Sequence, residues 1–354
     1  MKSITLLAIE TSCDETAVAV VKRTGDNIRV LANEIASQID VHKLTGGIVP
    51  EAAAREHVAV IRPMIEKAMK NAKVTGDKLD AIAVTVGPGL QPALSVGVTA
   101  AQTLSFAWQK PLVPVHHIEG HIYSALSPQI NPTAYSLQPI APFPALALIV
   151  SGGHTLLIKI SEHLQYEVIG STRDDAVGEA FDKVARMLDL SYPGGPIISK
   201  LSKEGDPNTF KFSRPMLNSK DLDFSFSGLK TEVLYKLREL NEKNIPYKKA
   251  DIAASFQQAA VEAVVKKTET AAKKHKPSLL LLAGGVAANR LLRSQMKDIG
   301  SRLSVPLQIS PQKLCGDNAI MIALTASLAF PAGRCKDWQK IDAVSRINIE
   351  EFST

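Results

Sequence analysis

The most restrictive feature of the sequence is a succession of apolar runs and turns that occurs twice. In the first half, "SITLLAIETS" predicts a buried strand that ends in a polar turn, and "TAVAVV" and "NIRVLANEI" predict two further strands. Residues 51–71 have apolar side chains at helical spacing. "LDAIAVTVGPG" then predicts a strand running into a tight turn, and "LSVGVTAAQTLSFA" predicts a helix.

The second half follows the same plan from Pro144. "PALALIVSGGHT" predicts a strand ending in a turn of small residues, and "LLIKI" and "YEVIG" predict the next two strands. Helices are expected at about residues 176–190, 226–241 and 250–275, followed by a strand, a glycine turn and a helix in "PSLLLLAGGVAANRLLRSQM". This order indicates an α/β protein built from two lobes of similar plan.

Four turns lie where predicted buried strands end, in "ETSCDET", "GPG", "SGGHT" and "AGGVAAN". In open α/β sheets, ligands bind at the carboxyl ends of the strands. Glycine lets the backbone approach a phosphate, and a following helix N-terminus favours an anion. Any one of these turns can simply connect two elements tightly, but four at equivalent places favour a nucleotide-binding cleft.

Composition limits the class of protein. The 354 residues suffice for two domains, and 45% hydrophobic residues allow each domain a core. The sequence has no apolar run of about 18 residues, and the first residues lack the pattern of a signal or transit peptide. Three dispersed cysteines fit a reducing compartment, so we expect a cytoplasmic protein without membrane contact. The net charge of +6 permits a nucleic-acid partner without requiring one.

The segment "VPVHHIEGHIYSAL" places three of the eight histidines within six residues. His117 and His121 are four residues apart, so on a helix both imidazoles face one metal ion, whereas His116 points elsewhere. Asp317, in the glycine-flanked loop of "CGDNAIMIAL", offers a third ligand. Two histidines and one carboxylate leave open positions, as in iron, zinc and manganese sites that bind substrate. The alternative is a helix that carries histidines without a metal.

Two further positions have an open interpretation. Asp182 lies within a predicted helix, where its carboxylate can accept hydrogen bonds from a ribose or pair with Arg186 one turn later. Asn289 can cap the helix that follows it or contact an adenosine. The lysines of "VVKKTETAAKKHK" can meet phosphates, although a solvated lysine-rich face is the more frequent explanation of such a segment.

The chain resembles one family over almost its whole length. The motifs "AIETSCDETAVAVV", "GGIVPEAAAREHV", "VTVGPGLQPALSVGVTAA", "VPVHHIEGHI", "IVSGGHTLLI", "DDAVGEAFDKVARMLDLSYPGGP", "FSFSGLKT", "LLAGGVAANRLLR" and "CGDNAIMIAL" occur in order between residue 4 and about residue 326. They are similar to those of the Kae1/Qri7/TsaD family of tRNA threonylcarbamoyl-adenosine transferases, once described as glycoprotein endopeptidases. The resemblance implies an actin-like ATPase (ASKHA) fold, with two ribonuclease-H-like lobes around a central cleft.

The resemblance also implies site residues. Its metal, usually taken as Fe²⁺ with Zn²⁺ in some members, would be held by His117, His121 and Asp317. Asp14 and Glu15 match acids near the cleft and are candidate catalytic residues. The substrate-binding positions implied for this chain are Ile149, Val150, Ser151, Gly152, Gly153, Asp182, Gly195, Ser199 and Asn289. The family often has an aspartate where this chain has Ser199, so a hydroxyl would replace a carboxylate there.

The activity implied by the resemblance is transfer of threonylcarbamoyl from threonylcarbamoyl-AMP to the adenosine 3′ of the anticodon, in tRNAs that read codons beginning with A. The implied partners are tRNA, the paralogue TsaB and the ATPase TsaE. Two alternatives are a small-molecule kinase of the same superfamily and a non-catalytic nucleotide-binding scaffold. A metalloprotease is disfavoured because Glu119 follows His117 by two positions rather than one.

The expected lobes are residues 1–113, with 326–354 packed on them, and residues 114–325, with the metal and nucleotide sites.

Overall fold

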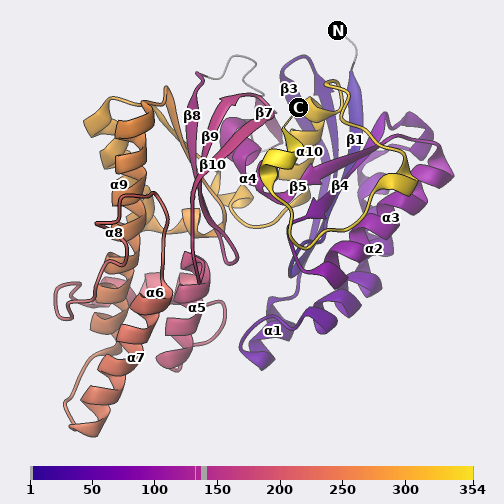
Figure 1. Cartoon of the computed structure of the whole chain (residues 1–354). Coiled ribbons are helices and arrows are strands. Elements are labelled where there is room, and N and C mark those ends of the chain that lie inside the picture. The colour runs from indigo at the N-terminus through magenta and orange to yellow at the C-terminus, as the bar shows by residue number, and fades with distance from the viewer. Residues whose placement is uncertain (1–2, 132, 137–141, 354) are drawn as a thin grey trace. The chain divides into compact units, whose positions relative to one another are not determined.

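The computed structural model describes residues 3–131, 133–136 and 142–353 (Figure 1). The chain divides into two compact units. Unit 1 comprises Met1–Ala141, Glu162–Tyr166 and Ser310–Thr354, and unit 2 comprises Pro142–Ser161 and Glu167–Ile309. Among the described residues, no helix combines the length and the apolar character needed to cross a membrane.

Unit 1 is built around a mixed sheet with the strand order β5-β4-β1-β2-β3-β7-β6. Strand β1 pairs antiparallel with β2 and parallel with β4, and β4 pairs parallel with β5. The strands are β1 (Ile4–Glu10), β2 (Glu15–Thr24), β3 (Asn27–Ser37), β4 (Ala81–Gly87), β5 (Leu112–His116), β6 (Gln129–Asn131) and β7 (Ala134–Ser136). The helices are α1 (Ile39–Thr45), α2 (Pro50–Ala72), α3 (Gln91–Trp108), α4 (His117–Leu126) and α10 (Ala319–Ala329), with 3₁₀ turns at 76–78, 312–314, 338–340 and 349–352.

Helices cover both faces of this sheet. Helices α2 and α3 pack together and against strands β1 to β4, whereas α10 packs on β1, β2, β4 and β5 from the other side (Figure 1). Strand β1 is therefore apolar on both faces, and Leu6 to Ile9 have no exposed area. On α2, Ile61 and Ile65 belong to the core, whereas Val58 is 64% exposed.

Unit 2 is also built around a mixed sheet. Its sheet has the order β10-β9-β8-β11-β12, in which β8 pairs antiparallel with β9 and parallel with β11. The strands are β8 (Ala145–Val150), β9 (Thr155–Glu162), β10 (Gln165–Ser171), β11 (Leu279–Ala283) and β12 (Leu307–Ile309). The helices are α5 (Val177–Met187), α6 (Gly194–Leu201), α7 (Ser227–Glu242), α8 (Lys249–His275) and α9 (Arg290–Leu303), with 3₁₀ turns at 202–204 and 285–288.

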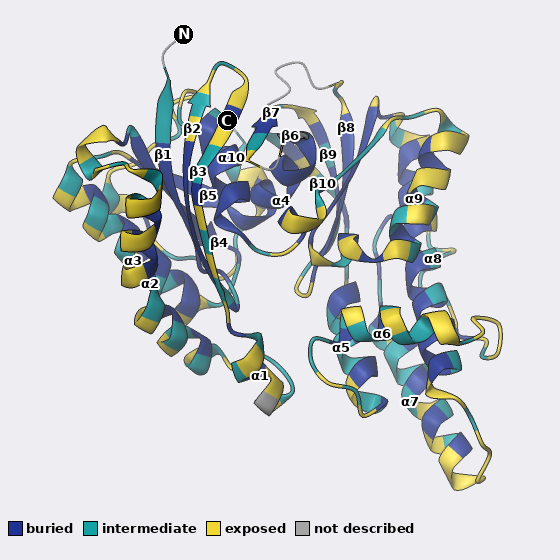
Figure 2. Cartoon of the chain, turned by 180° about the vertical axis from the view of Figure 1, so that it is seen from behind, coloured by how far each residue is buried: buried dark blue, intermediate teal, exposed yellow. Residues whose placement is uncertain are grey.

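Five strands of the unit 1 sheet have the same order as the five strands of the unit 2 sheet. In each unit the first strand lies in the middle, with the second and third strands on one side and the fourth and fifth on the other. The second strand is antiparallel to the first, whereas the fourth and fifth run parallel to it. Buried residues fill the central strands of each sheet (Figure 2). The duplicated plan read from the sequence therefore corresponds to two sheets of one topology.

The observed division of the chain differs from the expected boundary at residue 113. Helix α4 and helix α10 belong to unit 1, although the expected boundaries put α4 and residues 319–325 of α10 in the second lobe. The physical reason is α10, which follows β12 but is apolar all round and buries its residues against α4 and the unit 1 sheet. The histidine cluster and Asp317 consequently belong to unit 1.

Candidate functional site

The histidine cluster begins where β5 runs directly into α4. His116 is the N-cap of α4, and its Nδ1 accepts a hydrogen bond from the backbone N–H of Ile118 at 3.1 Å. Glu119 completes a capping box by accepting from the backbone N–H of His116 at 3.3 Å. These two members of the cluster therefore set where the helix starts, which leaves His117 and His121 on one face.

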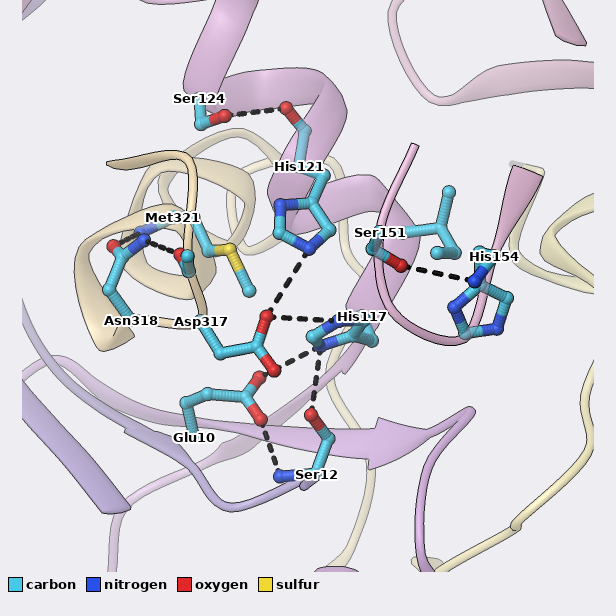
Figure 3. A network of polar contacts seen from close by, with 12 residues as sticks. Glu10, Ser12, His117, His121, Ser124, Ser151, His154, Asp317, Asn318 and Met321 are labelled. Atoms are coloured by element: carbon cyan, nitrogen blue, oxygen red, sulfur yellow. Dashed lines mark hydrogen bonds and ion pairs between the residues drawn. The ribbon is translucent and has the colours of Figure 1, made fainter. Parts of the chain in front are cut away.

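Asp317 meets this face from a segment 200 residues along the chain. Its Oδ1 lies 3.4 Å from Nε2 of His117 and 3.4 Å from Nε2 of His121 (Figure 3). Asn318 caps α10 immediately afterwards, accepting from the N–H of Met321 at 2.9 Å, which fixes the loop. Helix α10 approaches α4 so closely that a Cβ on Gly120 would lie 2.9 Å from Met321.

The three side chains have the composition and burial of a metal site. Their ligand atoms all lie within 4.8 Å of one another. His121 has no exposed area, and within the described part of the chain neither ring nitrogen has a hydrogen-bond partner. Leaving such a buried polar atom unpaired costs about 1–3 kcal/mol, which an ion bound by Nε2 would offset. Two imidazoles and a carboxylate fit a divalent metal such as iron or zinc.

The surroundings of His117 and His121 shift the pKa values of the two side chains in opposite directions. Burial lowers the pKa of His117, but the carboxylates of Asp317 and Glu10 outweigh burial and raise that pKa to about 9. Burial lowers the pKa of His121, with His117 acting in the same direction. In the metal-free protein at neutral pH, His117 therefore holds a proton that a metal must displace.

The apparent affinity of the three-residue cluster for a divalent metal should consequently rise with pH. A metal binds only the deprotonated ring, and the His117 pKa is about 9. The affinity should therefore increase about tenfold per pH unit below that pKa and level off above it. Competition with a chromophoric chelator, using Zn²⁺ at several pH values, measures this slope. An affinity that stays constant from neutrality to the pKa would contradict the prediction.

Asp14 ends the turn between β1 and β2 and Glu15 begins β2, in the same unit as the cluster. Asp14 is buried, and its backbone carbonyl accepts from the N–H of Gln38 at 3.0 Å. Burial and then the charge of Asp317 raise the pKa of Glu15 to about 10. The acids of this turn and the metal-binding candidates therefore share one electrostatic environment.

Sequence reasoning did not identify Glu10, Ser12 and His57, which organise this turn. Both nitrogens of His57 are used, with Nδ1 2.7 Å from Oγ1 of Thr16 and Nε2 3.0 Å from the carbonyl oxygen of Cys13. Glu10 and Ser12 contact His117 directly. The available signal was an acidic residue at the end of an otherwise apolar strand.

The four strand-end turns, three of which contain glycine, occur as two pairs, one in each unit. In unit 1, a Cβ on Gly89 would lie 2.5 Å from the carbonyl oxygen of Ser12. In unit 2, Gly284 has a φ of 94° and lies against Val150, where an added Cβ would be 2.3 Å from the carbonyl oxygen. The close approach of neighbouring turns thus requires glycine at these two positions.

The predicted substrate-binding turn, residues 149–153, ends β8. The N–H of Ser151 donates to the carbonyl oxygen of His154 at 2.8 Å, and the N–H of His154 donates to Oγ of Ser151 at 3.1 Å. Space is open above Gly152 and Gly153, where an added Cβ would meet nothing within 4 Å. The backbone of this turn is therefore accessible to a ligand.

Asp182 and Gly195 lie on two sides of one turn. Oδ1 of Asp182, on α5, accepts from the backbone N–H of Gly194 at 2.7 Å. The carboxylate thereby fixes the start of α6, a role that neither sequence interpretation contained. Gly195 follows with open space at its Cβ position.

Asn289 and Ser199 are connected through Gln257. Asn289 caps α9 by accepting from the N–H of Leu292 at 3.1 Å, and its Nδ2 donates to Oε1 of Gln257 at 2.8 Å. Nε2 of Gln257 donates to Oγ of Ser202 at 2.7 Å, and that hydroxyl donates to the carbonyl oxygen of Ser199 at 3.1 Å. A pocket of about 350 Å³ adjoins this chain and is lined in part by Ser199, Ser202, Lys203, Gln257 and Arg290.

Comparison with known proteins relates the whole chain to one family. The family model for TsaD, described as tRNA N6-adenosine threonylcarbamoyltransferase, matches residues 29–324. Proteins with that name from Staphylococcus aureus strains bovine RF122 / ET3-1 and JH9 are each 47% identical over 352 residues, covering 99% of this chain and 99% of the relative.

Solved structures show the fold at much lower identity. HypF from T. kodakarensis superposes with a TM-score of 0.60 at 14% identity, covering 93% of this chain and 48% of HypF. Full-length HypF in a phosphate- and nucleotide-bound form gives 0.58 at 13% identity, with 95% and 47% covered. This chain thus spans about half the length of HypF. The activator of 2-hydroxyisocaproyl-CoA dehydratase from Clostridium difficile, with bound ADPNP, gives 0.51 at 13% identity, with 98% and 100% covered.

Proposed function

Because the chain belongs to the tRNA N6-adenosine threonylcarbamoyltransferase family, we propose that it takes its acyl group from threonylcarbamoyl-AMP and releases AMP. The chain is an enzyme that transfers threonylcarbamoyl to an adenosine of tRNA, as its full-length relatives are named. The proposed acceptor is the adenosine 3′ of the anticodon, in tRNAs that read codons beginning with A.

The observation that carries the mechanism is the buried cluster of His117, His121 and Asp317. We assign these residues as the ligands of one divalent metal, with Fe²⁺ as the first choice and Zn²⁺ as the second. When bound, such an ion supplies Lewis-acid stabilisation of negative charge on an oxygen. The protein's part is to hold two imidazole nitrogens and one carboxylate oxygen in a buried, preorganised arrangement.

The adenylate half of the donor is assigned to unit 2. The accessible backbone at Gly152 and Gly153, the turn held by Asp182 and the pocket beside Ser199 provide groups for a phosphate and a nucleoside. Two structural relatives are solved with a bound nucleotide or ADPNP, which supports a nucleotide site in this fold without locating it. A hydroxyl at Ser199 would then hydrogen-bond the nucleoside where many relatives offer a carboxylate.

The proposed reaction is a single acyl transfer. The N6 nitrogen of adenine forms a bond to the carbamoyl carbon, and the bond from that carbon to the phosphate oxygen breaks. AMP leaves with the electron pair, and N6 loses a proton. Asp14 and Glu15 are our candidate groups for the transfer of that proton. An aromatic amine is a weak nucleophile, so orientation contributes strongly, by about 7–11 kcal/mol in favourable systems. The target base has to leave its stack, which costs little in a loop.

The alternatives fit the site less well. The family assignment leaves a kinase or a scaffold without support. A metalloprotease needs a glutamate base beside the metal, but Glu119 has no exposed area and both its oxygens bind Arg334 at 2.8 Å. The proposed protein partners are a TsaB paralogue and a TsaE ATPase.

A transfer assay tests the proposal. Purified chain with these partners, synthetic threonylcarbamoyl-AMP and unmodified tRNA should yield threonylcarbamoyl-adenosine, detected by mass spectrometry after digestion of the tRNA. Replacing the donor by threonine, bicarbonate and AMP should yield none. Absence of product, when a known enzyme works with the same tRNA and partners, would contradict the proposed donor.

A further inference from the structure

Glu10 is a fully buried carboxylate whose two oxygens both have protein partners. It ends β1 with no exposed area. Oε1 accepts from the backbone N–H of Ser12 at 2.5 Å, and Oε2 accepts from Oγ1 of Thr85 at 2.5 Å. A buried carboxylate is costly unless hydrogen bonds of this kind compensate for lost water. These bonds fix the orientation of the carboxylate between β1 and β4.

The remaining contact of Glu10 is with His117. Oε2 lies 3.3 Å from Nδ1 of His117, and Oγ of Ser12 lies 3.1 Å from the same nitrogen (Figure 3). Both oxygens of Glu10 already accept hydrogen bonds, from the N–H of Ser12 and the hydroxyl of Thr85, so in this contact Nδ1 is the donor and carries the hydrogen. In a neutral imidazole, the lone pair then resides on Nε2, the nitrogen that lies 3.4 Å from Asp317.

We propose that Glu10 is a positioning residue that holds His117 in the tautomer able to bind a metal through Nε2. Glu10 is not itself a ligand, because it lies on the Nδ1 side of the ring and its oxygens are bound by Ser12 and Thr85. His121 has no such partner, since within the described residues its Nδ1 forms no hydrogen bond. His117 is thus the ligand that the protein orients in advance, through strand β1.

The inference rests on the metal site proposed above. A measurement of metal binding distinguishes a failure of the inference from a failure of the metal site. Metal-free protein is titrated with Co²⁺, and the visible absorption of the bound ion reports occupancy and geometry. Glu10→Gln should weaken binding about 10–100-fold, since an amide can present N–H to Nδ1 and place the ring hydrogen on Nε2. Asp80→Asn is the matched control, because Asp80 also accepts a backbone N–H, from Thr5 at 2.7 Å, away from the cluster.

Each result decides between the possibilities. If the Co²⁺ affinities of the wild type and of Glu10→Gln agree within twofold, the role of Glu10 is overturned and the metal site stands. Absence of saturable Co²⁺ binding by the wild type refutes the metal site itself. Equal weakening by Asp80→Asn overturns the inference too, because the effect would then follow from any lost carboxylate in the sheet.

A measurement on the wild type does not depend on the folding of a variant. In Zn²⁺-loaded protein labelled with ¹⁵N-histidine, two-bond ¹H–¹⁵N correlations report which ring nitrogen carries hydrogen. The His117 signal, assigned by its loss in His117→Asn, should show a protonated Nδ1. A protonated Nε2 would overturn the proposal.

Discussion

Asp317→Ala should lower the rate of threonylcarbamoyl transfer by about 10³-fold or more and remove stoichiometric metal binding. Within the described part of the chain, Asp317 alone places a carboxylate oxygen 3.4 Å from Nε2 of both His117 and His121. A Lewis acid contributes several kcal/mol to transition-state stabilisation, and about 4 kcal/mol corresponds to 10³ in rate. Initial rates of threonylcarbamoyl-adenosine formation and metal content by mass spectrometry measure the two effects.

His117→Ala should reproduce this loss, and Asp342→Ala serves as the matched control. Asp342 is an exposed aspartate of the same unit, outside the cluster, so its removal should leave rate and metal content unchanged. Product formation at the wild-type rate by both cluster variants would remove the metal from the chemistry and leave it a structural role. Loss of activity with retained metal would instead assign Asp317 a role in the reaction other than binding the ion.

Much of the fold could be predicted from local patterns. Continuous apolar runs such as Leu6–Ile9 and Leu279–Ala283 became central strands buried on both faces, and the turns after them lie where expected. The actin-like ATPase fold with two ribonuclease-H-like units is confirmed by the strand order common to both sheets and by the structural relatives. The tRNA-modifying activity implied by the motifs is confirmed by the relatives.

The division of the chain could not be predicted, because it depends on where one apolar helix packs. Helix α10 follows β12 in sequence but packs on β1, β2, β4 and β5. An all-round apolar segment has no periodicity that selects one partner over another. The sequence therefore placed Asp317, which precedes α10, in the wrong unit while assigning it the right neighbours, His117 and His121.

The candidate site was predictable only where local spacing carried the information. The four-residue interval between His117 and His121 implies one helical face. Glu10 and Glu119 were not assigned their contacts, because Thr85 and Arg334 lie 75 and 215 residues away along the chain. For Asp182, the sequence offers a ribose or Arg186 as partner but does not indicate the hydrogen bond that Oδ1 accepts from the N–H of Gly194 across a turn. Contacts of this kind depend on tertiary packing, which no local pattern encodes.

Arg334→Met should destabilise unit 1 by about 3–5 kcal/mol, because it leaves a buried carboxylate without its cation. Glu119 has no exposed area, and Nη1 of Arg334 lies 2.8 Å from each of its oxygens. Nη2 of the same arginine donates to the carbonyl oxygen of Phe352, and the guanidinium lies over the Phe352 ring at 5.5 Å. The pair thereby connects the start of α4, and so the metal-binding candidates, to the C-terminal segment. Urea unfolding followed by circular dichroism measures the loss.

The pH dependence and a double variant distinguish this cause from a loss of packing. Burial raises the pKa of Glu119 even though Arg334 opposes the shift, so removing Arg334 should raise it further. A folded pKa above the unfolded one means that folding takes up a proton, so stability falls as pH rises between the two values. The deficit of Arg334→Met should therefore be larger at pH 8 than at pH 6. Adding Glu119→Gln should recover part of it, since a neutral amide is cheaper to bury than an unpaired carboxylate. A deficit that is independent of pH and additive in the double variant would show that packing, not charge, holds the C-terminal segment on α4.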